Sequence, residues 1–471
     1  MPNLVSYIFI TLYTLSVLSV VWVIISENRN PLKSMPWLIV LLLAPVVGLV
    51  FYFFFGQNLS KRRTINRRMR KQADAYLEEQ AQRDHPEVAP HLQPLEQLLV
   101  GNAHAVPLYD TQFTIYTNGS DKMEALLQAI GGAQKEIHLL YYIIEEDRTG
   151  MRLRDALIQK AQEGVSVRLL YDDVGSRTAS KSFFDTMRAG GVEVHEFLHV
   201  QFPRFTSKVN YRNHRKIVVI DGRIGFLGGM NIADRYVYGS KLGPWRDTHL
   251  RLEGGGVVGL QAAFINDWYA TTREQLTWPT LPTHAVRADA NVMQLLTSGP
   301  LGKWRTLSQA ACMAIGRARC RIWIQTPYYL PTEALNNALQ TAALAGIDVR
   351  LMLPMRSDAR MVDLAVHSYL DDMIRAGVKV LFYSEGFLHA KVMLIDDNLT
   401  ITGSANLDFR SFEHNFEINA FVYDADLNYR LATDFEQDEQ QCQEITAAAW
   451  FHRPRHQRMA ESIMRLFSPL L

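Results

Sequence analysis

Apolar and polar positions follow two regular spacings from about residue 110 to the end of the chain. Segments in which apolar residues recur every three or four positions alternate with short, continuous apolar runs. The first spacing predicts amphipathic helices, and the second predicts strands that are buried on both faces, with glycine-containing connections between them. Helices and strands in alternation favour an α/β fold in which helices cover both faces of a sheet.

This order of elements occurs twice. Three pairs of segments match in sequence and in succession: 129–142 with 314–329, 163–173 with 345–355, and 188–197 with 375–383. Two prolines interrupt the periodicity in 277–290, where we place the boundary between the copies. Two copies are too few for a solenoid. We therefore expect two duplicated α/β sandwich halves, 111–285 and 286–471, with pseudo-twofold symmetry that brings equivalent residues to one shared cleft.

The first 60 residues have a different pattern. Residues 4–25 are 22 uncharged and mostly apolar positions, enough to cross a hydrocarbon core of roughly 30 Å as a helix, and a second such run covers 35–56. A cleaved secretory signal is the alternative for the first run, but no basic segment precedes it and no small-residue cleavage site follows it. We expect residues 1–60 to form a two-helix transmembrane hairpin.

A basic segment follows the second apolar run. Seven lysines and arginines occupy 61–71, and we interpret 61–110 as a basic juxtamembrane linker. The positive-inside tendency places this linker, and the part of the chain after it, in the cytoplasm. Such a segment could also bind nucleic acid, but its position beside a predicted span favours a role in topology and in attraction to anionic lipid headgroups.

Composition narrows the class of protein. The chain has 49 basic and 48 acidic side chains, a net charge of +1, which gives no global reason to expect nucleic acid as a partner. The three cysteines, Cys312, Cys320 and Cys442, form no CxxC pair. This argues against a disulfide framework and against a zinc site built from cysteines.

One motif occurs once in each half. NHRKIVVIDGRIGFLGGMN (213–231) and LHAKVMLIDDNLTITGSAN (388–406) carry His, Lys, Asp, Gly and Asn at the same offsets. The apolar residues after each histidine are typical of a strand. Alternate side chains of a strand share a face, so the histidine and lysine of each copy should converge on one anion. We expect the catalytic residues to be His214 and Lys216 in the first copy, and His389 and Lys391 in the second.

The remaining motif residues are given other roles. Asp221 and Asp396 lie at an odd offset, which turns them away from the histidines, and we interpret them as structural members of the catalytic motif in a hairpin turn. Glycine lets a phosphate approach the backbone, and an asparagine amide can donate to its oxygens. We therefore expect a phosphate-binding cradle made of Gly229, Asn231, Ser404 and Asn406.

Two histidines in one cleft suit a two-step exchange of phosphodiesters. One neutral imidazole attacks phosphorus and forms a phosphohistidine, while the other gives a proton to the leaving alcohol; the second then deprotonates the incoming hydroxyl. The lysines and amides neutralise the non-bridging oxygens. No carboxylate cluster with metal-ligand spacing accompanies either motif, so we expect neither a metal ion nor a cofactor.

Each histidine needs a carboxylate to fix its tautomer. Asp247 and Glu417 follow the histidines of their own halves by 33 and 28 positions. We expect each to orient the histidine that precedes it, although either could be an ordinary surface acid.

The two H-x-K-x4-D motifs, each followed by G-[GS]-x-N, resemble the phospholipase D superfamily. With the apolar N-terminal runs, the basic segment, TPYYLP (326–331) and FSPLL (467–471), the chain is similar to bacterial cardiolipin synthases in particular. The likeness covers nearly the whole chain. Its departures are minor: Ser404 in place of the glycine of the first copy, and Asp397-Asn398 in place of Gly222-Arg223.

The resemblance implies a specific reaction. One phosphatidylglycerol would donate its phosphatidyl group to His214, and a second would accept it with His389 as acid and base, giving cardiolipin and glycerol. It also implies a multi-pass protein of the bacterial inner membrane. A membrane phospholipase D that hydrolyses or exchanges headgroups, a nuclease and a silent scaffold are the alternatives. Acyl-chain preference, use of phosphatidylethanolamine and oligomeric state are left open.

Overall fold

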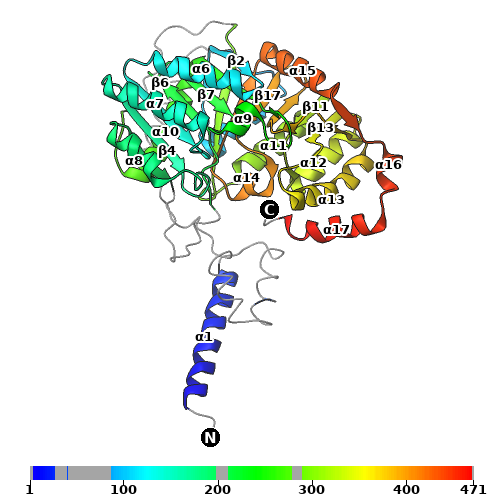
Figure 1. Ribbon diagram of the computed structural model, residues 1–471. Helices are drawn as coiled ribbons and strands as arrows, with labels where there is room; N and C mark the ends of the chain where they lie inside the picture. Colours follow the sequence, from blue (N-terminus) through cyan, green and yellow to red (C-terminus); the bar gives the residue numbers. More distant parts are fainter. Residues whose placement is uncertain (1–3, 27–39, 41–85, 198–210, 278–288, 469–471) are drawn as a thin grey trace. The chain divides into compact units, whose positions relative to one another are not determined.

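The computed structural model describes residues 4–26, 40, 86–197, 211–277 and 289–468 (Figure 1). The chain divides into two compact units. One unit comprises Met1–Arg62 with Val200–Tyr211, and the other comprises Arg63–His199 with Arg212–Leu471. In the first unit, the structure describes the helix α1 (Leu4–Ser26). Both copies of the repeat lie in the second unit, which carries the candidate site.

The first half of the repeat contains a seven-stranded sheet in the order β2-β9-β7-β6-β3-β4-β5. Its strands are β2 (Thr111–Tyr116), β3 (Glu136–Tyr141), β4 (Ser166–Asp172), β5 (Glu193–Phe197), β6 (Ile217–Ile220), β7 (Ile224–Gly228) and β9 (His249–Gly254). β3, β4 and β5 are parallel because helices connect them, whereas β6, β7 and β9 are antiparallel neighbours.

The second half repeats this topology. Its sheet has the order β1-β10-β19-β17-β16-β11-β13-β14-β20. Read across the sheet, β10-β19-β17-β16-β11-β13-β14 match β2-β9-β7-β6-β3-β4-β5 of the first sheet, strand by strand. The strands are β1 (Pro107–Tyr109), β10 (Val292–Ser298), β11 (Arg321–Gln325), β13 (Asp348–Pro354), β14 (Lys379–Tyr383), β16 (Val392–Ile395), β17 (Leu399–Gly403), β19 (Glu417–Tyr423) and β20 (Cys442–Glu444). The shared strand order confirms the duplication that the sequence predicts.

Helices flank both sheets. Those of the first half are α6 (Gly119–Gly131), α7 (Arg148–Gln162), α8 (Lys181–Ala189), α9 (Asp234–Tyr238) and α10 (Gly255–Thr272). Those of the second half are α11 (Thr306–Arg317), α12 (Glu333–Leu344), α13 (Arg360–Ala376), α14 (Phe409–Glu413), α15 (Ala425–Glu439), α16 (Ala447–Phe451) and α17 (Arg455–Arg465). Asn118, Asp147 and Ser180 cap α6, α7 and α8 by accepting a backbone N–H three residues later, which fixes where each helix begins.

Among the described residues, three large hydrophobic cores hold these layers together, beside a smaller cluster around Trp245 and Phe387. One lies between the first sheet and α6 to α8, and another lies between the second sheet and α11 to α13. The third is shared by the two halves: Ile217 and Trp268 from the first half pack in the same cluster as Met352 and Val392 from the second. Because burial of apolar surface is the main stabilising contribution to folding, the shared core joins the halves into one body.

Part of the expected linker belongs to the second half. The helix α5 (Gln93–Ala103) buries Leu95 and Leu99 in the core of that half, and β1 pairs antiparallel with β10. The prediction of a linker over 61–110 is therefore wrong for these elements. Without β1, the edge of β10 would present unpaired backbone groups. Residues 61–85 lie outside the described residues.

The predicted hairpin falls largely outside the described residues too. Within the part of the chain that the structure describes, we found no helix with the length and apolar character that crossing a membrane requires. Of the second apolar run, 35–56, only Val40 is described.

Candidate active site

Two short contacts between the halves position the histidines. β15 (Phe387–Leu388) of the second half runs parallel to β8 (Trp245–Arg246) of the first. The pairing continues for one residue, because the His389 backbone N–H donates to the Arg246 carbonyl at 2.7 Å. The next residue after Arg246 is Asp247, so the pairing of β8 with β15 brings this carboxylate beside His389.

The equivalent contact forms with the halves exchanged. Asn213 forms a parallel bridge with Phe416, and the His214 backbone N–H donates to the Phe416 carbonyl at 2.9 Å. The residue after Phe416 is Glu417. Each motif histidine therefore lies beside a carboxylate that the opposite half supplies.

The histidine–carboxylate pairs are crossed. Nδ1 of His389 lies 2.6 Å from Oδ2 of Asp247, and Nδ1 of His214 lies 3.0 and 3.1 Å from the two carboxylate oxygens of Glu417. The prediction that each carboxylate orients the histidine of its own half is wrong in its pairing. The physical reason is the pair of backbone contacts between the halves, β8 with β15 and Asn213 with Phe416. Each contact places a histidine beside the carboxylate residue that follows in the other half.

The crossed pairs leave one ring nitrogen to react. A carboxylate that accepts from Nδ1 fixes the tautomer in which Nε2 of the neutral ring carries a lone pair. Both histidines are buried, with exposed fractions of 9% for His214 and 6% for His389. Among the described residues, no group of three or more His, Cys, Asp or Glu side chains is arranged to hold a metal ion.

The two motif lysines are buried at the same place. Nζ of Lys216 donates to the His214 carbonyl at 2.6 Å, and Nζ of Lys391 donates to the His389 carbonyl. Burial lowers the pKa of Lys216 to about 7 and that of Lys391 to about 8, and the charge of Lys391 contributes to the lowering at Lys216. Two ammonium groups that repel each other in a desolvated place are stabilised when an anion binds between them.

The histidines are neutral in this environment. Burial is the first cause that lowers the pKa of His214, and burial followed by the charge of Lys391 lowers the pKa of His389 to about 3. A neutral imidazole is the form that can attack phosphorus. A bound phosphodiester brings negative charge, which favours the protonated form of the second ring.

These pKa shifts predict an early alkaline limb in the pH profile of kcat/KM. A lysine is charged below its pKa, so positive charge is lost as pH rises through about 7 for Lys216 and about 8 for Lys391. We expect kcat/KM, which reports the free enzyme, to begin to fall above about pH 7 and to fall more steeply above about pH 8, at least roughly two units below the range of an ordinary lysine. Assays at fixed lipid and detergent composition measure this limb.

A matched substitution tests the cause of that limb. Lys216→Arg keeps its charge throughout the range, so the profile of this variant should stay level through about pH 7 and fall only above about pH 8, where Lys391 loses its charge, even where its activity is reduced. A profile that stays flat to about pH 9.5 in the unchanged protein contradicts the assignment.

The two motif aspartates lie away from this cluster. Both have left-handed backbone conformations, with φ of 53° at Asp221 and 49° at Asp396. Their carboxylates accept backbone N–H groups from the loop before the central strand of their half: those of Gln134, Lys135 and Glu136 at Asp221, and of Arg319, Cys320 and Arg321 at Asp396. This geometry agrees with a structural role, in a hairpin loop of three residues.

The motif asparagines are already engaged in part. Nδ2 of Asn231 donates to the Tyr236 hydroxyl at 2.6 Å, and Nδ2 of Asn406 donates to Asp408 at 2.9 Å. An amide nitrogen carries two hydrogens, so one donor of each asparagine is left for a ligand. Phosphate binding by these two residues stays a prediction.

Gly229 and Ser404 face the orienting carboxylates. A Cβ at Gly229 would lie 2.2 Å from Oδ1 of Asp247, so only glycine leaves room for that carboxylate. The Ser404 side chain is fully buried, and its hydroxyl donates to Glu417 at 2.6 Å. Phosphate binding by Gly229 and Ser404 stays a prediction beside these contacts with Asp247 and Glu417. The sequence signal for these contacts is the replacement of glycine by serine between the two copies. Glycine faces the shorter carboxylate, Asp247, and serine faces the longer one, Glu417.

We expect Gly229→Ala to reduce turnover far more than it perturbs the fold. The added methyl group must displace Asp247, which then no longer orients His389, and forced overpacking costs about 1–3 kcal/mol. Turnover and thermal unfolding of the same preparation separate the two effects. Gly131→Ala is the matched control, because a Cβ there meets nothing within 4 Å. Wild-type turnover in Gly229→Ala would show that the position of Asp247 is unimportant.

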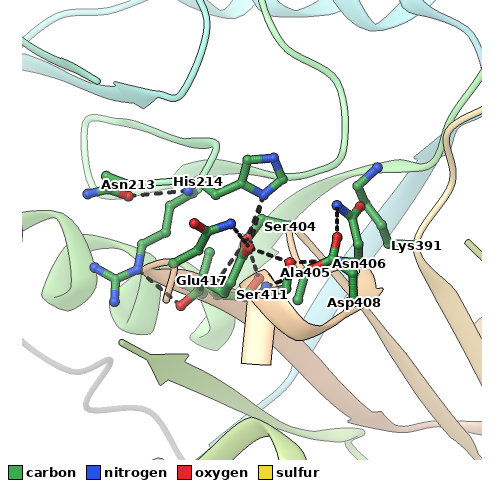
Figure 2. A network of polar contacts seen from close by, with 12 residues as sticks. Asn213, His214, Lys391, Ser404, Ala405, Asn406, Asp408, Ser411 and Glu417 are labelled. Carbon is green, nitrogen blue, oxygen red and sulfur yellow. Dashed lines mark hydrogen bonds and ion pairs between the residues drawn. The ribbon is translucent and has the colours of Figure 1, made fainter. Parts of the chain in front are cut away.

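A hydrogen-bond network fixes Glu417, and sequence reasoning did not anticipate it. Figure 2 shows the carboxylate at the centre of contacts with His214, Ser404 and Ser411. Ser411 donates to it at 2.8 Å and Asn415 at 3.3 Å. Charge-assisted hydrogen bonds of this kind hold a buried carboxylate ionised and in one orientation.

Aromatic rings surround the histidines. The ring of Tyr142 lies 4.7 Å from that of His214, edge to face, and Trp245 and Tyr236 lie 5.3 and 5.6 Å from His389. Tyr142 could be found from the tyrosine pair that ends both repeated segments, 129–142 and 314–329. Tyr236 and Trp245 lie between the motif and Asp247 in sequence, and no pattern distinguished them. The rings shield the reacting nitrogens from water.

Comparisons with known proteins agree with this arrangement. Residues 126–241 and 311–439 match the family model described as cardiolipin synthase, PLD-like domain, and 14–57 match the phospholipase D-nuclease N-terminal model. Cardiolipin synthase 2 of Bacillus cereus is 42% identical over 98% of this chain and 91% of its own length. The major cardiolipin synthase ClsA of Bacillus subtilis is 40% identical over 99% of this chain and 100% of its own length.

The chain belongs to the cardiolipin synthase family of the phospholipase D superfamily. The resemblance read from the two motifs is thereby confirmed. A solved structure in the wider fold class, phosphatidylserine synthase of Haemophilus influenzae, superposes with a TM-score of 0.61 over 80% of this chain and 97% of its own, at 14% identity. That likeness concerns the fold alone: this chain and the neighbour share an α/β architecture.

Proposed function

We propose that the protein is a cardiolipin synthase that transfers the phosphatidyl group of one phosphatidylglycerol to a second one and releases glycerol. The observation that carries the proposal is the pair of crossed histidine–carboxylate contacts beside two buried lysines. High identity to proteins named cardiolipin synthase, over almost the full length, supports this lipid chemistry in preference to other phosphodiester chemistry.

The first step forms a covalent intermediate. Nε2 of His214 attacks phosphorus of the donor lipid, a P–N bond forms, and the P–O bond to glycerol breaks. His389, protonated when the anionic substrate is bound, gives its proton to the departing glycerol oxygen, and Asp247 stabilises its imidazolium form. Lys216 and Lys391 neutralise the non-bridging oxygens as charge develops on them.

The second step reverses the first with a different alcohol. His389, now neutral, takes the proton of the terminal hydroxyl of a second phosphatidylglycerol. That oxygen attacks the phosphohistidine, the P–N bond breaks, and cardiolipin is released. One phosphodiester replaces another, so the reaction needs no nucleotide, and its direction follows the concentrations of lipid and glycerol.

Water is the competing acceptor. Its attack on the intermediate gives phosphatidic acid, which is the product of the alternative function, a membrane phospholipase D. The buried histidines and the aromatic rings around them favour lipid over water as acceptor.

Product stoichiometry tests the proposed function. The full-length protein in detergent, given phosphatidylglycerol alone, is expected to form cardiolipin and glycerol in equal amounts, with phosphatidic acid as a minor product. His214→Ala is the blank for each product. Phosphatidic acid with glycerol and no cardiolipin would establish hydrolysis in place of synthesis.

We also propose that the apolar runs 4–25 and 35–56 form a transmembrane hairpin that holds the catalytic unit at the cytoplasmic face of the plasma membrane. The uncharged character of both runs and the basic segment 61–71 support this topology. Alkaline extraction of membranes should leave the full chain in the pellet, and a C-terminal tag should be digested only when the cytoplasmic face is open to protease. Recovery of the chain in the alkaline supernatant, or protection of the tag, contradicts the anchor or its orientation.

A further inference from the structure

The C-terminal helix α17 is attached to the protein by its polar side. Glu461 in its middle is buried, with an exposed fraction of 2%. Its carboxylate accepts from Arg453 at 2.8 Å and from Gln457 at 3.1 Å, and it lies 3.6 Å from His367 of α13. Polar contacts therefore hold this helix against α13.

The opposite side of α17 is apolar and exposed. Met459 is 63% exposed and Ile463 is 49% exposed, while Leu466 and Phe467, which follow the helix, are 78% and 46% exposed. Their spacing of four, three and one positions places them on one face of a continued helical path. A surface helix of a globular protein normally turns its apolar face inward and its polar face to water. Here the arrangement is inverted, so the exposed face needs an apolar medium outside the fold.

Arginines border this apolar face. Arg458 is 44% exposed and lies 3.9 Å from Asp371 of α13. Arg465 is turned toward α13, where it donates to the Ser368 carbonyl at 3.1 Å and lies 3.6 Å from Asp372. Arg455 precedes Arg458 by one helical turn on the same flank. Arginine can lay its aliphatic part along an apolar surface and extend its guanidinium to phosphate. An apolar strip with a cationic border is complementary to the headgroup and acyl boundary of an anionic bilayer, and a purely apolar protein partner would not need the border.

We propose that α17, with Leu466 and Phe467, lies in the surface of an anionic membrane, its apolar face in the acyl boundary and its arginines at the phosphates. This contact orients the catalytic unit against the bilayer that contains its lipids. It is separate from the N-terminal runs and from the chemistry of the histidines, and it stands whether the enzyme synthesises or hydrolyses phospholipid.

A fluorescent probe at position 463 tests the proposal in the full chain. Ile463→Cys is made in a background in which Cys312, Cys320 and Cys442 are serine, labelled with a polarity-sensitive fluorophore and reconstituted into vesicles. Tyr429→Cys is the matched control: Tyr429 is 72% exposed on α15, far from α17 within the same unit (Figure 1). Lipids brominated in their acyl chains are expected to quench the probe at 463 at least about twofold more than the probe at 429, because only an interfacial helix reaches that depth.

Lipid charge and competing occupants are tested in the same preparation. Quenching at 463 should be stronger in vesicles that contain phosphatidylglycerol than in phosphatidylcholine alone, and replacing Arg455 and Arg458 with glutamine should remove this difference. Equal quenching at the two positions overturns the proposal. A blue-shifted probe that brominated lipid does not quench also overturns it, and shows that protein covers the face: a second copy if the shift depends on the protein-to-lipid ratio, and another segment of the chain if it does not. No readout requires turnover, so failure here is distinct from failure of the proposed reaction.

Discussion

Asp247→Asn is expected to reduce kcat by about 10²–10⁴-fold while the fold stays intact, because the amide can no longer stabilise the imidazolium of His389 or hold its tautomer. The substitution keeps the size of the side chain, so packing beside Gly229 changes little. Turnover under saturating lipid measures the effect. Asp397→Asn is the matched control, since that side chain is 90% exposed and lies outside the site.

The affected histidine distinguishes crossed from same-half pairing. In a protein with ¹⁵N-labelled histidine, Asp247→Asn should change the ring signals of His389, and Glu417→Gln should change those of His214. Double substitutions add a second test: Asp247→Asn should have little further effect once His389 is alanine, because residues that act as one unit are not additive. Altered His214 signals in Asp247→Asn, with His389 unchanged, would support the pairing within one half.

His214→Ala is expected to abolish transfer, whereas His389→Ala should permit the first step when the leaving group needs no proton. A phosphatidyl ester of nitrophenol supplies such a leaving group, because its anion is stable near neutral pH. The His389→Ala variant should release one nitrophenolate per active site and then stop, since no base activates the incoming alcohol. The phosphatidyl group should be found on His214.

Intact mass and peptide mapping of the stopped enzyme measure this trapped intermediate. The double variant His214→Ala with His389→Ala is the blank for non-enzymatic release. A burst in His214→Ala, with the phosphatidyl group on His389, would exchange the roles of the two histidines. The absence of a burst in either single variant, with both proteins folded, would contradict covalent catalysis.

The fold of the repeat could be predicted to a large extent from the sequence. Apolar runs such as 216–220 and 391–395 have the composition of buried strands, and the order of elements around them is the same in both halves. Such regularity is local, because each strand or helix is encoded in its own periodicity. The odd offset of Asp221 and Asp396 from the histidines also predicted that these side chains point away from them. Their contacts with backbone N–H groups agree with this prediction.

The contacts between the halves could not be predicted in the same way. The sequence identified Asp247 and Glu417 as candidates for orienting the histidines. Their crossed pairing depends on backbone contacts between residues far apart in sequence, such as Arg246 with His389. The periodicity of a segment predicts its own secondary structure. It contains no information about whether the segment contacts its own half or the other one. The same limit explains α5 and β1, whose membership in the second half follows from the free edge of β10.

The arrangement makes each half dependent on the other. Each histidine takes its tautomer from a carboxylate of the other copy, and the shared core includes strands of both. Neither half contains a complete histidine–carboxylate pair. We therefore propose that the duplication yields one shared site and not two.

Vanadate binding tests this claim of a single shared phosphate site most directly. As a phosphate analogue that accepts an additional ligand, vanadate should bind with one equivalent per chain and contact Nε2 of both His214 and His389 in a structure of the complex. Either single alanine substitution should then weaken this one binding event. Two equivalents per chain, or one equivalent whose affinity does not depend on one of the histidines, would show that the two rings serve separate sites.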